Sequence, residues 1–129
     1  MEKNGDEMGN KEEELKKLLD EFQSAGDIIG AAVVRSDGLM ILSSLPQDVN
    51  SKAVAAMAAA IVGTGETASN ELSIGKLNQV VVESANGKLI SIGASPEVIF
   101  TVLVKPKANM GLILMNMERS SKKIGRIIG

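Results

Sequence analysis

The chain has 129 residues, a formal net charge of −2 from 14 Lys and Arg against 16 Asp and Glu, and neither Cys nor His. Disulfides, thiolate metal sites and cysteine nucleophiles are thereby excluded, and the commonest general base and metal ligand is missing. With no basic excess and only two aromatic residues, we expect no nucleic-acid partner. The longest apolar run, 53–62, is far shorter than the roughly 20 residues of a membrane-spanning helix. These features predict a soluble, cytoplasmic protein without membrane insertion.

The first segment divides into a polar tail and a helix. Residues 1–10 lack apolar periodicity, which predicts a disordered tail ahead of a single domain over residues 11–129. From Lys11 the apolar residues recur at the spacing of one helix face, namely Leu15, Leu18, Leu19 and Phe22. Gly26 suits the end of this helix, because glycine readily takes the left-handed conformation.

The next stretch predicts a β-hairpin. Residues 28–35 are apolar and rich in β-branched side chains, as in a strand buried on both faces. The Ser36-Asp37-Gly38 step is typical of a tight turn, and residues 39–44 supply the partner strand. Pro46 ends that strand, and Asp48 or Asn50 is suited to cap a following helix.

The helix predicted at about 50–72 is apolar on more than one side. At 100° per residue, its larger apolar residues fall together and are expected to face the sheet: Val54, Met57, Ala58, Ile61, Ala68 and Leu72. Nearly opposite lies a stripe of small residues with polar flanks Lys52, Glu66 and Asn70: Ala56, Ala59, Ala60, Gly63 and Thr67. A solvent-facing stripe is normally charged, so the small uncharged centre needs an explanation.

Two explanations fit this stripe. Alanine is a strong helix former, so the stripe could reflect helix propensity alone. Alternatively, small side chains allow the helix of a second subunit to approach closely. Gly63 and Gly65 favour the second explanation, since each glycine costs about 1 kcal/mol relative to alanine inside a helix.

The C-terminal half predicts three more strands and a helix. The strands are expected at 77–84, 88–94 and 98–104, with Asn86-Gly87 as a two-residue turn between the first two. The third is apolar and should lie centrally beside 28–35. Asn109 is suited to cap a last helix whose buried face is Met110, Ile113, Met117, Ile124 and Ile127. The order α-β-β-α-β-β-β-α indicates an α+β fold, a five-stranded antiparallel sheet with helices on its faces.

No motif predicts catalysis, a cofactor site or a metal site. The Gly-Thr-Gly-Glu-Thr stretch at 63–67 lies within a helix and lacks the Lys of a phosphate-binding loop. The carboxylates are scattered over polar helix faces and turns, where they are solvated. Arg35, Arg119 and Arg126 could each act as an arginine finger, although surface solubility explains them more simply. The basic group Lys122, Lys123 and Arg126 is too small to indicate a lipid or nucleic-acid site.

Several stretches together resemble the roadblock family, which includes the roadblock light chains of dynein and regulators of bacterial and archaeal polarity GTPases. They are GAAVVRSDGLMI at 30–41, AVAAMAAAIVGTGETAS at 53–69, QVVVESANGKLISIG at 79–93 and VLVKPKANMGLILMNM at 102–117. The resemblance implies a profilin-like fold, with the middle helix on one face of the sheet and the terminal helices on the other.

The resemblance also implies a homodimer and a partner. Family members pair through their middle helices and join their sheets edge to edge through the third strand. Here that implies an interface at Ala56, Ala59, Ala60, Gly63, Thr67 and Asn70 of the helix, and Gln79, Val80, Val81 and Val82 of the strand. The implied function is to bind and regulate a small Ras-like GTPase without catalytic residues. The alternatives are a nucleotide-independent scaffold or motor-complex adaptor, and a small-ligand sensor, for which an aromatic pocket would be poorly furnished.

Overall fold

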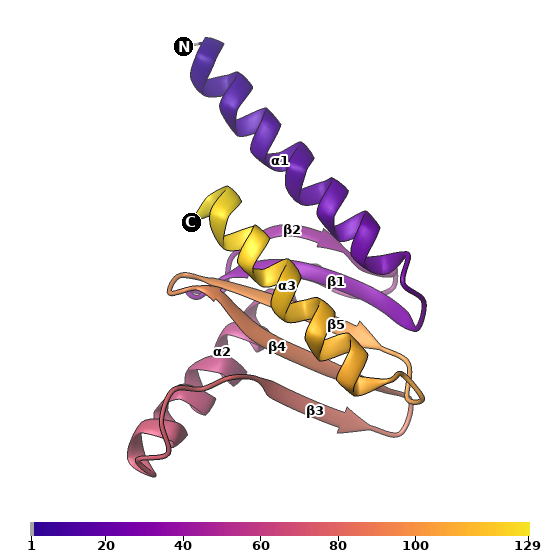
Figure 1. The fold of residues 1–129 in the computed structure, drawn as a ribbon, viewed down its shortest axis with the longest axis vertical. Coiled ribbons are helices and arrows are strands. Elements are labelled where there is room, and N and C mark those ends of the chain that lie inside the picture. Colours follow the sequence, from indigo (N-terminus) through magenta and orange to yellow (C-terminus); the bar gives the residue numbers. More distant parts are fainter. Residues whose placement is uncertain (1) are drawn as a thin grey trace.

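Three helices cover the two faces of one antiparallel sheet whose strand order is β2-β1-β5-β4-β3 (Figure 1). The computed structural model describes the backbone of residues 2–129 and the side chains of residues 9–129. The elements are α1 (Glu2–Gln23), β1 (Ile28–Arg35), β2 (Met40–Ser44), α2 (Ser51–Glu71), β3 (Val80–Ser84), β4 (Gly87–Ser95), β5 (Val98–Val104) and α3 (Met110–Ile128). The predicted fold class and element order are confirmed.

The centre of the sheet is formed by β1 and β5, the two nearly continuous apolar segments of the sequence. Alternate residues of β1 enter separate cores: Ala31 and Val33 face α1 and α3, whereas Ala32 and Val34 face α2. A strand buried on both faces gains from apolar side chains at every position, which explains why neither segment alternates with polar residues.

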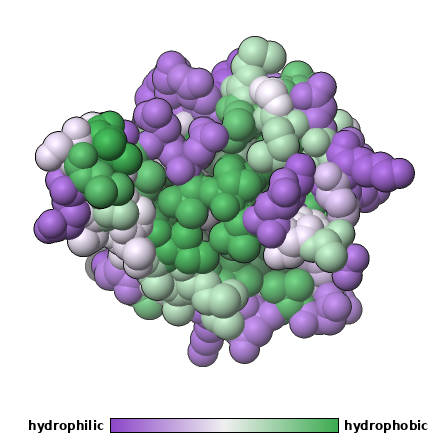
Figure 2. All heavy atoms as spheres, turned by 90° about the horizontal axis from the view of Figure 1, so that it is seen from below, coloured by the Kyte–Doolittle hydropathy of each residue, from purple (hydrophilic) through white to green (hydrophobic). Residues whose placement is uncertain are grey.

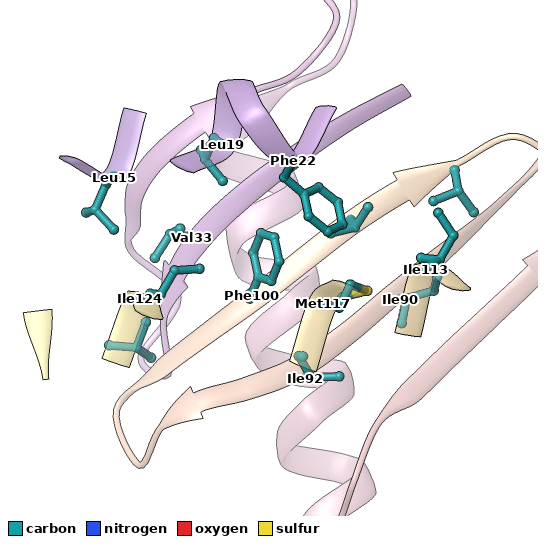
Figure 3. Packing of buried hydrophobic residues seen from close by; sticks show 14 of the residues in the cluster. Leu15, Leu19, Phe22, Val33, Ile90, Ile92, Phe100, Ile113, Met117 and Ile124 are labelled. Atoms are coloured by element: carbon teal, nitrogen blue, oxygen red, sulfur yellow. The ribbon is translucent and has the colours of Figure 1, made fainter. Parts of the chain in front are cut away.

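The larger core lies between the sheet and the terminal helices (Figure 3). Helix α1 contributes Leu15, Leu19 and Phe22 to it, and α3 packs against β4 and β5. The ring of Phe22 meets that of Phe100 edge to face, with centroids 5.2 Å apart and an interplanar angle of 76°. This geometry is favoured by the aromatic quadrupoles. The two aromatic residues of the chain therefore join α1 to the central strand.

Helix α1 begins earlier than we expected. Its backbone is helical from Glu2, where the sequence predicted a disordered tail over residues 1–10; Met1 lies outside the described residues. The N-terminal part of α1 projects past the sheet (Figure 1). At its other end the helix stops at Gln23, and Gly26 takes a φ of +79°, as predicted.

The two other helices begin at the predicted caps. The side chain of Asn50 accepts a hydrogen bond from the Ala53 amide at 3.1 Å, and that of Asn109 accepts one from the Leu112 amide at 3.2 Å. Each bond satisfies an amide that the first helical turn leaves without a backbone partner.

The turn between β3 and β4 differs from the prediction. Its two residues are Ala85 and Asn86, and Gly87 already belongs to β4, paired with Ser84. Neither Asn86 nor Gly87 takes a positive φ. A β-carbon on Gly87 would lie 3.1 Å from the carbonyl oxygen of Val104, so close packing on β5 accounts for this glycine. Strand β3 also starts at Val80, three residues later than expected.

The face that α2 turns to the sheet is not the predicted one. Its buried residues are Ala55, Ala58, Val62 and Ser69, while Met57, Ala68 and Leu72 are exposed; only Ala58 was predicted correctly as buried, with Val54 and Ile61 half-buried. Small residues let the helix lie close to β1, where Ala32 is fully buried beneath it. The prediction was wrong because it assumed that the largest apolar side chains seek the sheet. Instead, Met57 of α2 and Leu72 at its C-terminal cap are exposed.

Candidate interaction surface

The outward side of α2 carries the small residues singled out from the sequence. Ala56, Ala60, Gly63, Thr67 and Asn70 are all exposed in the single chain. Ala59, also predicted at the interface, is half-buried and packs against the smaller core beneath α2. The stripe is therefore accessible along the length of the helix and bounded on one side by residues that hold α2 to the sheet.

Two threonines, Thr67 in this stripe and Thr64 beside it, make the outward side of α2 less polar than its sequence suggests. The Thr64 hydroxyl donates to the Ala60 carbonyl at 2.8 Å, and the Thr67 hydroxyl donates to the Gly63 carbonyl at 3.0 Å. Because both hydroxyls are bonded within the helix, a neighbouring surface could cover them without leaving a donor unsatisfied.

The two glycines of α2 have different explanations. A β-carbon on Gly65 would lie 3.1 Å from side-chain atoms of both Leu77 and Val80, so this glycine lets the segment leading into β3 cross the helix closely. A β-carbon on Gly63 would have no neighbour within 4 Å. Packing within the chain therefore explains why a helix-destabilising glycine stands at position 65. It does not explain the glycine at position 63.

The remaining predicted residues lie at the edge of the sheet. Gln79 immediately precedes β3 and is exposed, and Val80 is half-buried on the α2 side next to Gly65. Val81 and Val82 point to opposite faces and are both exposed. Strand β3 pairs with β4 on one side only, so its outer edge presents unpaired backbone donors and acceptors.

Several large apolar side chains of α2, of β3 and of the segment between them are exposed. Those on and between α2 and β3 have high exposed fractions: Met57 50%, Leu72 67%, Ile74 71%, Val81 39% and Val82 41%. Seen from the side on which β3 and the C-terminal end of α2 lie, the middle of the molecule is apolar and ringed by polar residues (Figure 2). Monomeric proteins rarely expose a continuous surface of this kind. We call the outward side of α2 with Leu72, Ile74 and the outer edge of β3 the α2/β3 surface.

Sequence reasoning missed two members of this surface. Leu72 was placed on the sheet side, and Ile74 was not considered. Leu72 is the C-terminal cap of α2, and Ser73 takes a φ of +52°, so the chain reverses before Ile74. The signal for Ile74 was its position just before Gly75, in a turn where large apolar residues are seldom found.

No group of three or more Asp and Glu among the described side chains, those of residues 9–129, is placed to hold a metal ion. Arg35 is engaged by Asp37 at 2.6 Å, while Arg119 and Arg126 line a cleft between α1 and α3. No helix in this part of the chain is both long and apolar enough to cross a bilayer. The chemistry that the surface offers is apolar contact and backbone pairing.

Comparison with known proteins identifies the family of this chain and proteins that share its fold. The model of the Roadblock/LC7 domain family matches residues 14–104. The chain is 38% identical over 110 residues to the uncharacterized protein MJ1340 of Methanocaldococcus jannaschii, covering 85% of this chain and 96% of that protein. MglB of Myxococcus xanthus superposes with a TM-score of 0.83 at 16% identity, over 89% of this chain and 94% of that one. Profilin II of Acanthamoeba castellanii superposes with a TM-score of 0.54 at 17% identity, over 80% and 90%. The chain belongs to the Roadblock/LC7 domain family and has a profilin-like fold.

Proposed function

We propose that the protein is a homodimeric interaction module that binds and regulates a small Ras-like GTPase and contributes no catalytic residue of its own. The observation that carries this proposal is the exposed α2/β3 surface, because an apolar face next to a free sheet edge is suited to bind protein. Membership of the Roadblock/LC7 family supports the class of partner, since the resemblance of the sequence to this family implies GTPase regulation.

The dimer would use both parts of the α2/β3 surface. Two α2 helices would pack through Ala56, Ala60 and Gly63, where small side chains allow close approach of the backbones. Two β3 strands would pair edge to edge, which would extend the sheet and satisfy the free donors and acceptors of each edge. Gly63 supports this arrangement, since a residue with open space around it in the single chain could contact a second copy.

The GTPase would keep its own catalytic groups. None of the three arginines is assigned as a finger: Arg35 is paired with Asp37, and Arg119 and Arg126 lie on α3, across the sheet from α2. Regulation would consist of ordering the GTPase's switch segments through contact, as expected for a protein that offers an apolar surface and few converging charges.

The first experiment captures partners from a lysate of the source organism with the immobilised protein, once with GDP and once with a non-hydrolysable GTP analogue. A small GTPase enriched with the GTP analogue supports regulation. Capture that ignores the nucleotide identifies a scaffold or adaptor instead, and a metabolite that copurifies with the protein would favour a ligand sensor.

Hydrolysis assays with the identified GTPase then test the absence of a finger. Arg35→Ala, Arg119→Ala and Arg126→Ala should each leave the stimulated rate within about twofold of wild type. Loss of a true finger lowers the rate by roughly 10³-fold or more, so a drop of that size in one variant contradicts the proposal.

A further inference from the structure

A cleft of ≈ 600 Å³ is lined by α1 and α3, which pack against each other on the face of the sheet opposite α2. Helix α1 packs on β1 and β2, at the far side of the sheet from β3. A dimer formed through the α2/β3 surface would leave this cleft open on each subunit. The cleft is therefore available to a different partner.

The cleft has an apolar floor and charged rims. Its floor is formed by Leu18, Phe22 and Ile127, of which Phe22 is buried and the other two are half-buried. The α3 rim carries three cations and no acid: Arg119, Lys123 and Arg126. The α1 rim alternates in sign, with Glu14, Lys17 and Glu21. In a chain whose net charge is negative, this is a local excess of positive charge.

The three cations of the α3 rim form one row. Arg119, Lys123 and Arg126 are spaced i, i+4, i+7, so they lie on one side of the helix and span roughly 10 Å along its axis. The salt bridges among the described side chains involve Arg35, Lys88 and Lys122, and none involves this row. Lys122, one residue from Lys123, lies outside the cleft and pairs with Glu118 at 3.8 Å. The row thus faces the cleft without an acidic partner from the described residues.

We infer that the α1/α3 cleft is a docking groove for an amphipathic helix of a partner protein, acidic along one flank. The apolar stripe of that helix would lie on Leu18, Phe22 and Ile127, as when an amphipathic helix enters a groove between two others. Its acidic flank, with carboxylates at the same i, i+4, i+7 spacing, would pair with Arg119, Lys123 and Arg126. The charge pattern sets the orientation, because the alternating α1 rim offers no comparable row.

Other anionic partners fit less well. An anionic membrane would be repelled by exposed acids on α1, including Glu12, Glu13 and Asp20, and a flat surface would not reach the floor between two helices. A small anion would contact part of the row and leave the apolar floor uncovered. An amphipathic helix with an acidic flank can pair with the whole row of cations and also cover the apolar floor. The inference does not depend on GTPase binding.

The test uses two synthetic, fluorescein-labelled amphipathic helices that share a Leu stripe and differ only in having Glu or Gln along one flank. Each is titrated with the full-length protein and followed by fluorescence anisotropy. The Glu peptide should bind about tenfold more tightly than the Gln peptide at low ionic strength, and this preference should shrink in high salt. Equal affinity for the two peptides would overturn the inference.

Matched variants locate the binding. The triple variant Arg119→Gln/Lys123→Gln/Arg126→Gln should lose the preference for the Glu peptide, whereas Lys122→Gln on the same helix should keep it. Circular dichroism and light scattering should show unchanged folding and oligomeric state for both variants. Equal weakening by Lys122→Gln, or binding to phosphatidylserine vesicles without binding to the Glu peptide, would overturn the inference.

Discussion

Gly125 of α3 lies so close to Ala94 of β4 that a β-carbon on the glycine would lie 2.5 Å from the Ala94 carbonyl oxygen. The pairing of β4 with β5 shifts register between Gly93 and Ser95, so Ala94 lies at an irregularity of the strand. The bare backbone of Gly125 lets α3 press onto this point. The helix is thereby seated on the sheet by backbone contact as well as by its apolar side chains.

Gly125→Ala should destabilise the protein by roughly 1–3 kcal/mol, because the new methyl group meets backbone that has no room to yield. This loss should appear although alanine favours a helix by about 1 kcal/mol over glycine. Urea unfolding followed by circular dichroism measures the difference. Gly111→Ala, on the same helix but with its nearest neighbour at 3.5 Å, should show no loss. Equal stability of the Gly125 variant and wild type would mean that α3 is not held at this contact.

Gly63→Leu should produce a folded monomer at concentrations where the wild type is a dimer. The leucine has open space in its own chain but would separate two α2 helices packed through small residues. Light scattering measures the mass, and Gly63→Ala serves as the smaller substitution, expected to retain more of the dimer. If the leucine variant dimerises as the wild type does, the small-residue stripe is not the interface.

Val82→Lys should weaken the dimer at least tenfold, since it would bring charge into an apolar contact and set two like charges near each other. The side chain is 41% exposed in the single chain, so the substitution should leave the fold intact. Sedimentation over a concentration series gives the dissociation constant. Leu112→Lys makes the same change at a residue 48% exposed on α3, outside the proposed interface, and should have little effect. Comparable weakening by both variants would contradict edge pairing through β3.

Ser91 and Thr101 form a buried hydroxyl pair 2.7 Å apart beneath α2, and Thr101 also donates to the Ile90 carbonyl at 3.3 Å. Thr101→Val should cost about 1–3 kcal/mol, because the Ser91 hydroxyl is left without its partner. Ser91→Ala should cost less, since Thr101 keeps its bond to the carbonyl. The double variant measured by urea unfolding should lose less than the sum of the two single losses. Additive losses would show that the two hydroxyls act independently.

The parts of the fold that could be predicted from sequence are those set by local signals. Each of these features can be recognised from a few neighbouring residues: the continuous apolar runs of β1 and β5, and the capping residues Asn50 and Asn109. The β3–β4 turn could not be placed correctly, because Gly87 serves packing against Val104 and not turn geometry. The orientation of α2 was also predicted wrongly. Because this helix has apolar residues on several sides, periodicity did not distinguish the face that meets the sheet from the face that is exposed.

Only part of the α2/β3 surface could be predicted from the sequence. The outward stripe around Gly63 was visible as small residues where charge is normally expected. The edge position of β3 came from family resemblance, since an apolar strand such as 80–84 does not reveal whether it has one neighbour or two. The basic row on α3 was seen only as a cluster with Lys122. In the structure, Lys123 and Arg119 both line the cleft between α1 and α3, whereas Lys122 does not. The sequence could not show this, because the side of α3 that faces α1 was not known from it.

The two cores of the protein are unequal, and the smaller one holds α2 chiefly through Ala55, Ala58 and Val62. Alanine buries little area, so the chain itself contributes modestly to keeping this helix in place. If a second subunit covers the other side, α2 gains much of its protection from that neighbour. Amide hydrogen exchange in α2 should then accelerate on dilution while β1 and β5 stay protected, and the melting temperature should rise with protein concentration. Dimer formation would therefore determine how often α2 detaches from its own sheet.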